Sequence, residues 1–177
     1  MNLLVKNIFR FLLLVLFQVY VLDKILLHQM VTPYLYFIFI LWLPFSIGRS
    51  WLMFIGFLLG YTIDSFRQNP GFHAAACVLI AYLRPFVVNL LMPNDGAEAN
   101  YSEPSAKSFG GFLPYFIYAG VLATVHNVWL FLLEAWQFAD PMYFLLKSVL
   151  STVVTLFWMF AVELIFNRKQ KFKTNTA

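Results

Sequence analysis

The side chains that could do chemistry in this chain are ionisable residues inside apolar sequence, and many of them lie in one stretch, Trp51 to Pro85. Two apolar segments there are joined by a short polar turn, a pattern typical of two membrane helices that form a hairpin. Each charge at the centre of a bilayer costs roughly 2.5 to 3.5 kcal/mol by insertion scales. Every charge in this stretch therefore needs a structural or functional reason.

Glycine and charge share one face of the first helix expected in this hairpin. Gly56, Gly60 and Asp64 recur at every fourth position, and Arg67 follows one turn later. A Gly-x-x-x-Gly pair lets another helix approach closely, either inside the protein or across a homodimer, and the internal contact is favoured. Asp64 is open to two readings: a helix-end carboxylate paired with Arg67 or His73, or a ligand- or partner-binding group.

The second helix of the hairpin brings further candidates. Gly71 opens it, and His73 lies about as far from the turn as Asp64 does, so the two side chains could meet at one depth. Arg84 lies about three turns further on, just before Pro85, and could either reach the membrane surface or form an internal ion pair. We expect packing or partner contact from these residues.

A second polar seam is expected between the last two apolar segments. His126 and Asn127 lie on one of them, and Ser148 and Thr152 belong to a hydroxyl stripe on the other. Hydrogen bonds between helices are the simpler explanation, and substrate binding is the alternative. The sequence has no phosphate-binding glycine loop, no metal-ligand spacing and no nucleophile beside a base, so we predict no catalytic residue, metal or cofactor.

Composition predicts an integral membrane protein. Of the 177 residues, 62% are hydrophobic and 11% are charged, whereas charged residues make up about a quarter of a soluble domain. We expect an all-α bundle of six transmembrane helices forming one domain over residues 1–168, with a cytoplasmic loop at 93–111 and a basic cytoplasmic tail at 169–177. The loop is expected to be a solvated connector, and a docking segment for a cytoplasmic partner is the alternative. The expected spans are 7–27, 33–47, 51–66, 71–92, 112–138 and 141–166.

Positive charge sets the expected topology. Six spans place most basic residues on one side, which predicts that this side, with both termini, is cytoplasmic. Five spans would separate the basic tail from Lys6 and Arg10. The second segment is short and is bracketed by Pro33 and Pro44, so it could also be re-entrant. The basic residues lie near the chain ends without interleaved aromatics, which favours a lipid surface over nucleic acid.

Residues 57–66 (FLLGYTIDSF), 70–76 (PGFHAAA) and 80–84 (IAYLR) resemble the MreD family of bacterial rod shape-determining inner-membrane proteins. The shared pattern is a G-x-x-x-D segment that leads into a G-x-H-A helix start and an AYL stretch. The matched positions are Gly60, Asp64, Gly71 and His73. The resemblance is specific over about 35 residues, and elsewhere it rests on length, number of spans and a basic tail.

This resemblance implies a non-enzymatic scaffold of the cell-elongation (Rod) complex. Its implied partners are MreC, the actin-like MreB, and the peptidoglycan polymerase and transpeptidase. The family also resembles the six-helix substrate-binding components of energy-coupling-factor vitamin transporters. The alternative is therefore a transporter component that binds a small molecule near Asp64, His73 and the polar seam. The first span lacks the Ala-x-x-x-Ala pattern that such components use to meet their coupling partner.

Overall fold

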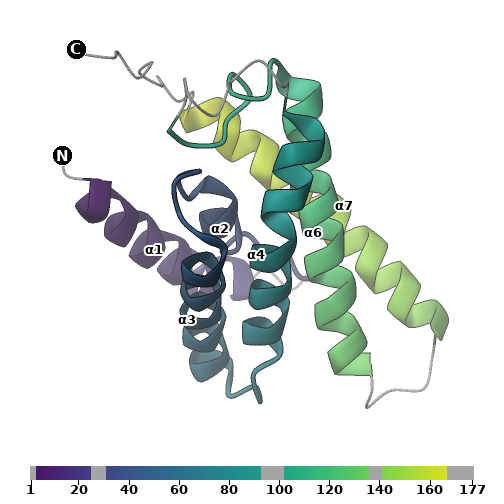
Figure 1. Cartoon of the computed structure of the whole chain (residues 1–177). Coiled ribbons are helices and arrows are strands. Elements are labelled where there is room, and N and C mark those ends of the chain that lie inside the picture. The colour runs from purple at the N-terminus through teal and green to yellow at the C-terminus, as the bar shows by residue number, and fades with distance from the viewer. Residues whose placement is uncertain (1–2, 25–30, 93–101, 136–140, 167–177) are drawn as a thin grey trace, which may run out of the picture.

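The computed structural model describes residues 3–24, 31–92, 102–135 and 141–166, and these residues form an all-helical bundle, as expected (Figure 1). Five long helices dominate the described part, with one short α-helix and one 3-10 turn between the first two of them. In chain order the elements are α1 (Leu3–Tyr20), η1 (Leu22–Lys24), α2 (Ile38–Trp42), α3 (Arg49–Arg67), α4 (Phe72–Leu91), α6 (Phe112–Ala135) and α7 (Pro141–Phe166).

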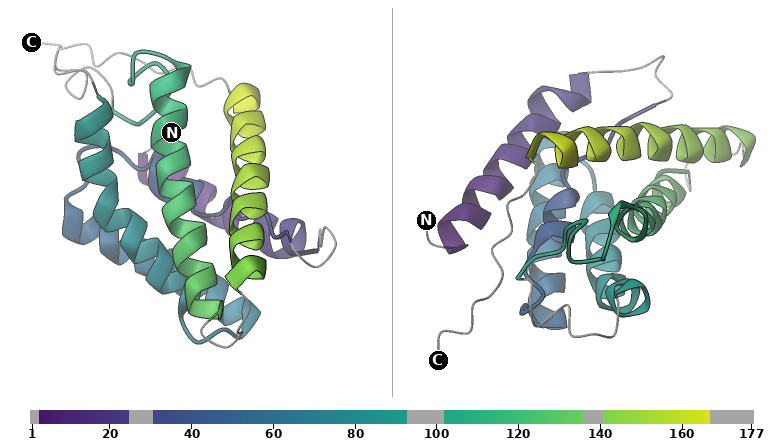
Figure 2. Two further views of the ribbon diagram at one scale, coloured as in Figure 1. Left: turned by 90° about the vertical axis from the view of Figure 1, so that its right-hand side faces the viewer. Right: turned by 90° about the horizontal axis from the view of Figure 1, so that it is seen from above.

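The long helices form a ring, which the view from above shows best (Figure 2). α1 contacts α3, α3 contacts α4, α4 contacts α6 and α6 contacts α7. The ring closes where Phe17 of α1 meets Trp158 of α7, with ring centroids 6.4 Å apart. The short helix α2 lies inside this ring, between α1 and α4 (Figure 1). The hydrophobic core is therefore centred on the chain around α2.

Four helices among the described residues are long and apolar enough to cross a membrane, which supports a membrane protein. They cover Leu4–Lys24, Phe72–Leu91, Phe112–Glu134 and Met142–Glu163. α3 has a suitable length but includes Arg49, Asp64 and Arg67. The observed α7 has the bounds expected for the last segment, and α3 and α4 begin and end within two residues of the expected spans. The first helix differs more, because α1 begins at Leu3 and ends at Tyr20, whereas the expected span was 7–27.

The expectation of a membrane helix at 33–47 is wrong. Only Ile38–Trp42 of this segment is α-helical, yet each residue from Tyr34 to Leu43 is at most 5% exposed. The segment passes through the middle of the bundle from the level of Gln18 to the level of Ser102, whose carbonyl oxygen accepts a hydrogen bond from the Phe45 amide. Non-helical backbone at membrane depth is tolerated where protein surrounds it, as here.

Proline and aromatic residues explain why this segment is not a regular helix. Leu43 precedes Pro44 and has ψ 147°, because the proline ring disfavours helical backbone in the residue before it. The rings of Tyr36 and Phe37 then fill the bundle centre around His126, with Phe37 stacked on the imidazole at 4.4 Å. Their burial favours a path through the core over a lipid-facing helix.

The described part of the long loop, residues 102–111, is folded against the bundle and is not a solvated connector. Phe109 is buried and stacks on Tyr118 with centroids 4.8 Å apart. The buried Glu103 carboxylate binds Lys6 at 3.1 Å and Arg10 at 3.0 Å. Burial alone would raise the pKa of Glu103, but these two cations hold it below its ordinary value of 4.5. The rest of the loop, 93–101, and the expected tail at 169–177 lie outside the described residues.

Candidate functional site

The two glycines of the expected face set the separation of α3 and α4. A Cβ atom on Gly60 would lie 2.4 Å from the Ala74 Cα, and one on Gly56 would lie 3.0 Å from the Cys77 carbonyl oxygen. The hairpin therefore needs glycine at position 60, because the backbone of α4 occupies the space of any side chain. Both residues pack within the chain, as the sequence favoured, and neither forms a free seam for a homodimer.

Asp64 caps the start of α4 from the neighbouring helix. Its carboxylate accepts backbone N–H bonds from His73 at 3.1 Å and from Ala74 at 2.8 Å. The first N–H groups of a helix have no partner within the helix and carry its positive dipole end, so a carboxylate stabilises them. Gly71 supplies the positive φ (95°) with which the chain enters α4. Asp64 thus fixes where the second helix of the hairpin begins.

His73 links this cap to a chain of charges. Its Nδ1 lies 2.8 Å from the same carboxylate, and its Nε2 lies 3.2 Å from an Arg67 nitrogen. Because guanidinium groups only donate hydrogen bonds, Nε2 must accept, and Nδ1–H therefore donates to Asp64. The ring is neutral in this arrangement. The sequence offered Arg67 or His73 as the partner of Asp64, and the structure selects His73.

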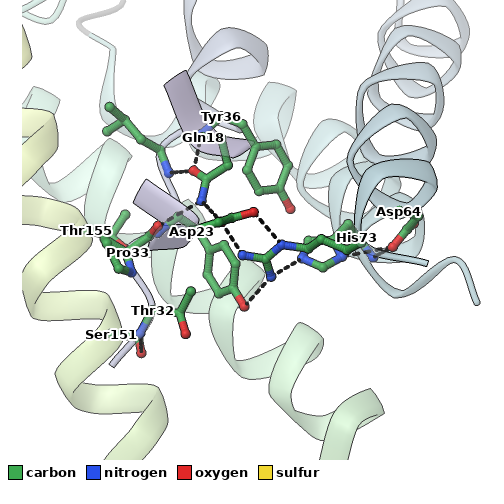
Figure 3. Close-up of polar contacts among 12 residues, drawn as sticks. Gln18, Asp23, Thr32, Pro33, Tyr36, Asp64, His73, Ser151 and Thr155 are labelled. Atoms are coloured by element: carbon green, nitrogen blue, oxygen red, sulfur yellow. Dashed lines mark hydrogen bonds and ion pairs between the residues drawn. The ribbon is translucent and has the colours of Figure 1, made fainter. Parts of the chain in front are cut away.

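The guanidinium of Arg67 pairs with Asp23 after α1, a partner that the sequence reading missed. It also donates to the Tyr34 hydroxyl at 3.1 Å. Asp23 accepts a further bond of 2.8 Å from the Gln18 side-chain amide. Hydrogen bonds thus run from α1 through η1 and α3 to the start of α4 (Figure 3).

Gln18 also holds the non-helical segment in place. Its amide donates to the Pro33 carbonyl oxygen at 3.0 Å, and its side-chain oxygen accepts from the Leu35 amide at 2.8 Å (Figure 3). From the opposite side, the Ser151 hydroxyl accepts a hydrogen bond from the backbone N–H of Thr32, and the Thr155 hydroxyl accepts one from the backbone N–H of Tyr34. An unpaired backbone amide in an apolar interior costs several kcal/mol, so these side chains replace helical bonds that the segment lacks.

Arg84 binds the backbone of the same non-helical segment at its other end, near Leu43. Its guanidinium donates to the Leu43 carbonyl oxygen and, at 3.1 Å, to the Tyr118 hydroxyl, which itself donates to the Leu41 carbonyl oxygen. Arg84 is 3% exposed and forms no ion pair with any described residue. It therefore neither reaches the surface nor forms the internal ion pair that the sequence suggested.

The expected polar seam is present and is made of hydrogen bonds between side chains. The Asn127 amide donates to the Thr152 hydroxyl at 3.1 Å, and its oxygen lies 3.2 Å from His126 Nδ1. The other imidazole nitrogen meets the Tyr36 hydroxyl at 2.8 Å. Ser148 is buried on the same stripe, and its hydroxyl is the one buried side-chain group without a partner among the described residues. Within those residues, no group of three metal-binding side chains occurs.

A groove of about 1140 Å³ runs along the outer face of the hairpin. Its floor is formed by small residues of α4, and its walls by aromatic rings of α3, α4 and α6 that are partly exposed. The lining residues that matter below are Met53, Phe57, Tyr61, Ser65, Ala74, Ala75, Tyr82 and Trp129. Asp64 borders the groove but is 2% exposed, because its oxygens are turned to α4.

The candidate site is thus a packed polar network with an apolar groove beside it. The chain was compared with protein-family models, curated proteins and solved structures, and none of them matches it.

Proposed function

We propose that this protein is a non-enzymatic scaffold of the bacterial cell-elongation machinery, similar to MreD, in the inner membrane. The observation that supports this proposal most is the joint structural role of the four residues that carry the resemblance. Gly60 sets the helix separation, Gly71 shapes the turn, and Asp64 and His73 fix the start of α4. A motif used for rigidity fits a protein that positions partners.

The polar groups of the network support the same proposal. Asp64, His73 and Arg84 all bind other parts of this chain and are nearly inaccessible. Their hydrogen bonds hold the hairpin and the central segment in one arrangement. These residues would therefore support partner binding through the fold and not by direct contact. The proposed partners are MreC, MreB and the polymerase and transpeptidase of the Rod complex. They would meet the outward faces of the ring, where α1 and α7 expose long apolar side chains.

We further propose that the end of the bundle carrying Lys6, Arg10, Arg49 and Lys107 is cytoplasmic. The contacts of Lys6 and Arg10 with Glu103 place the start of α1 beside the loop that contains Lys107. The buried segment brings the chain back to the end of the bundle that carries Lys6 and Lys107 before α3 begins at Arg49. The hydrogen bond from the Phe45 amide to the Ser102 carbonyl oxygen fixes this position. Both termini are then cytoplasmic, as in the six-span topology, although the second crossing is mostly non-helical.

Packing disfavours the alternative of a transporter component that holds its ligand inside the bundle. The space between His73 and His126 is filled by the rings of Tyr34 and Tyr36, whose centroids lie 5.5 to 6.0 Å from the two imidazoles. A vitamin-sized ligand needs a cavity of about 300 Å³ or more. Such a ligand would have to displace the central segment.

The test is affinity purification of the tagged protein from mildly solubilised native membranes, followed by mass spectrometry. Recovery of MreC and wall-synthesis enzymes is expected. Gly60→Ala should reduce that recovery per folded protein, and Gly120→Ala should not, because the nearest atoms to a new Cβ at this helix glycine are Leu156 methyl groups at 4.0 Å. Recovery of an ATPase with its membrane coupling subunit, without MreC, would contradict the scaffold proposal and support the transporter alternative.

A further inference from the structure

A guanidinium group lies next to one end of the outer groove. Arg49 is the first residue of α3, and its Cζ lies 5.3 Å from the ring centroid of Tyr82 and 4.7 Å from that of Phe86. Tyr82 lines the groove, as does Met53, one turn after Arg49 on the same helix. The charge of Arg49 therefore lies over the rings of Tyr82 and Phe86, next to the end of the groove.

Arg49 differs from three other cations near helix ends. Arg10, Arg67 and Lys147 each bind a carboxylate, whereas Arg49 has no ion pair with any described residue. It is exposed, and the chain just before α3 is bonded to the loop at Ser102. Arg49 thus lies at the end of the bundle where a membrane would meet water, with its donors available to an anion.

We propose that this groove binds one anionic phospholipid, with its phosphate on Arg49 and an acyl chain along the floor of the groove. A guanidinium matches phosphate oxygens with two parallel hydrogen bonds. From Arg49 to Phe57 the helix rises about 12 Å, which is within the roughly 15 Å hydrocarbon depth of one leaflet. A chain attached to a phosphate at Arg49 therefore reaches the aromatic walls.

The shape and charge of the groove favour a lipid over a partner helix as the occupant. The floor at Ala74 and Ala75 lies between the rings of Phe57, Tyr61 and Trp129, and a flexible acyl chain can fill such an uneven channel. A helix would also have to bring a carboxylate to the depth of Arg49, whereas the anionic leaflet supplies phosphates at that depth. The site is independent of the proposed scaffold function.

Native mass spectrometry of the purified full chain tests this proposal. The delipidated protein is titrated with phosphatidylglycerol and, separately, with phosphatidylcholine of the same chains. The wild type should bind the first phosphatidylglycerol about fivefold more tightly, the contribution of one arginine near an anionic lipid. Arg49→Gln should abolish this preference. Lys107→Gln, which removes an exposed charge from the same end of the bundle, should leave it unchanged.

A second variant tests the groove itself. Ala75 is exposed on the floor, so Ala75→Phe should weaken the binding of both lipids while the unfolding midpoint stays unchanged. The proposal is overturned if Arg49→Gln retains the preference, if Lys107→Gln lowers it equally, or if Ala75→Phe binds lipid normally. It is also overturned if a photo-crosslinker at Phe57, an exposed residue of the groove, captures a partner membrane protein in native membranes instead of lipid.

Discussion

Replacing Gly60 by alanine should separate the two helices of the hairpin. The new Cβ would lie 2.4 Å from the Ala74 Cα and 2.5 Å from the His73 carbonyl oxygen, whereas ordinary contacts begin at 3.4 Å. Backbone cannot rotate away as a flexible side chain can, so the first turn of α4 must retreat by about 1 Å. That shift would lengthen the 2.8 Å bond from Ala74 to Asp64 beyond hydrogen-bonding distance.

The magnitude follows from three contributions. Overpacking costs about 1 to 3 kcal/mol, and weakening the charge-assisted bonds of Asp64 adds about 1.5 to 3 kcal/mol. The higher helix propensity of alanine returns up to about 1 kcal/mol. We expect Gly60→Ala to lower the free energy of unfolding by about 1.5 to 6 kcal/mol.

Two matched variants isolate the close contact from helix propensity. At Gly56 a new Cβ would lie 3.0 Å from the Cys77 carbonyl oxygen and 3.2 Å from the Ala81 Cβ, so the helices need to shift by only a few tenths of an ångström, and the loss of stability should be smaller than at Gly60. At Gly120 the nearest atoms are Leu156 methyl groups at 4.0 Å, so alanine should stabilise by about 0.5 to 1 kcal/mol. Unfolding in mixed micelles by increasing dodecyl sulfate, followed by circular dichroism, measures all three. If Gly60→Ala were as stable as Gly120→Ala, the reasoning about the helix contact would be refuted.

Three further predictions concern the polar groups. Asp64→Asn should destabilise by about 1 to 3 kcal/mol in the same unfolding assay, because an amide NH₂ then faces the N–H groups that start α4; stability equal to the wild type would contradict the cap. Arg84→Met should cost about 1 to 3 kcal/mol in the same assay, because it leaves the buried Leu43 carbonyl oxygen without its Arg84 donor, and Arg84→Lys should restore part of this stability. The pKa of Glu103 is lower in the folded protein than its ordinary value of 4.5, so the unfolded chain takes up this proton first. Glu103 therefore stabilises the fold above about pH 4.5 and loses this effect as the pH falls through the folded pKa, so Glu103→Gln should flatten the acid limb of a plot of unfolding free energy against pH.

Local periodicity was sufficient to predict the hairpin. The spacing of Gly56, Gly60 and Asp64 placed them on one face, and the equal distances from the turn brought His73 to the carboxylate. These relations lie within one helix or across one short turn, where sequence distance determines spatial distance. The hydroxyl stripe on α7 was also visible, although Ser151 and Thr155 bind a backbone rather than another helix.

The path of residues 33–47 could not be predicted from hydropathy. A buried extended segment and a membrane helix are both apolar, and Pro33 and Pro44 were the main signs of irregular backbone. The pairing of Arg67 with Asp23 joins residues 44 positions apart, and only the packed ring brings them together. Gln18 was a missed signal, because a lone amide within an apolar span needs a buried partner.

The scaffold proposal is tested most directly by depleting this protein in the cells that naturally make it while imaging the cell outline and the position of MreC. The account predicts that cells lose their rod shape and become round, and that MreC disperses from its sites along the membrane. Cells that stay rod-shaped, with MreC still in place after the protein has disappeared, would contradict the account.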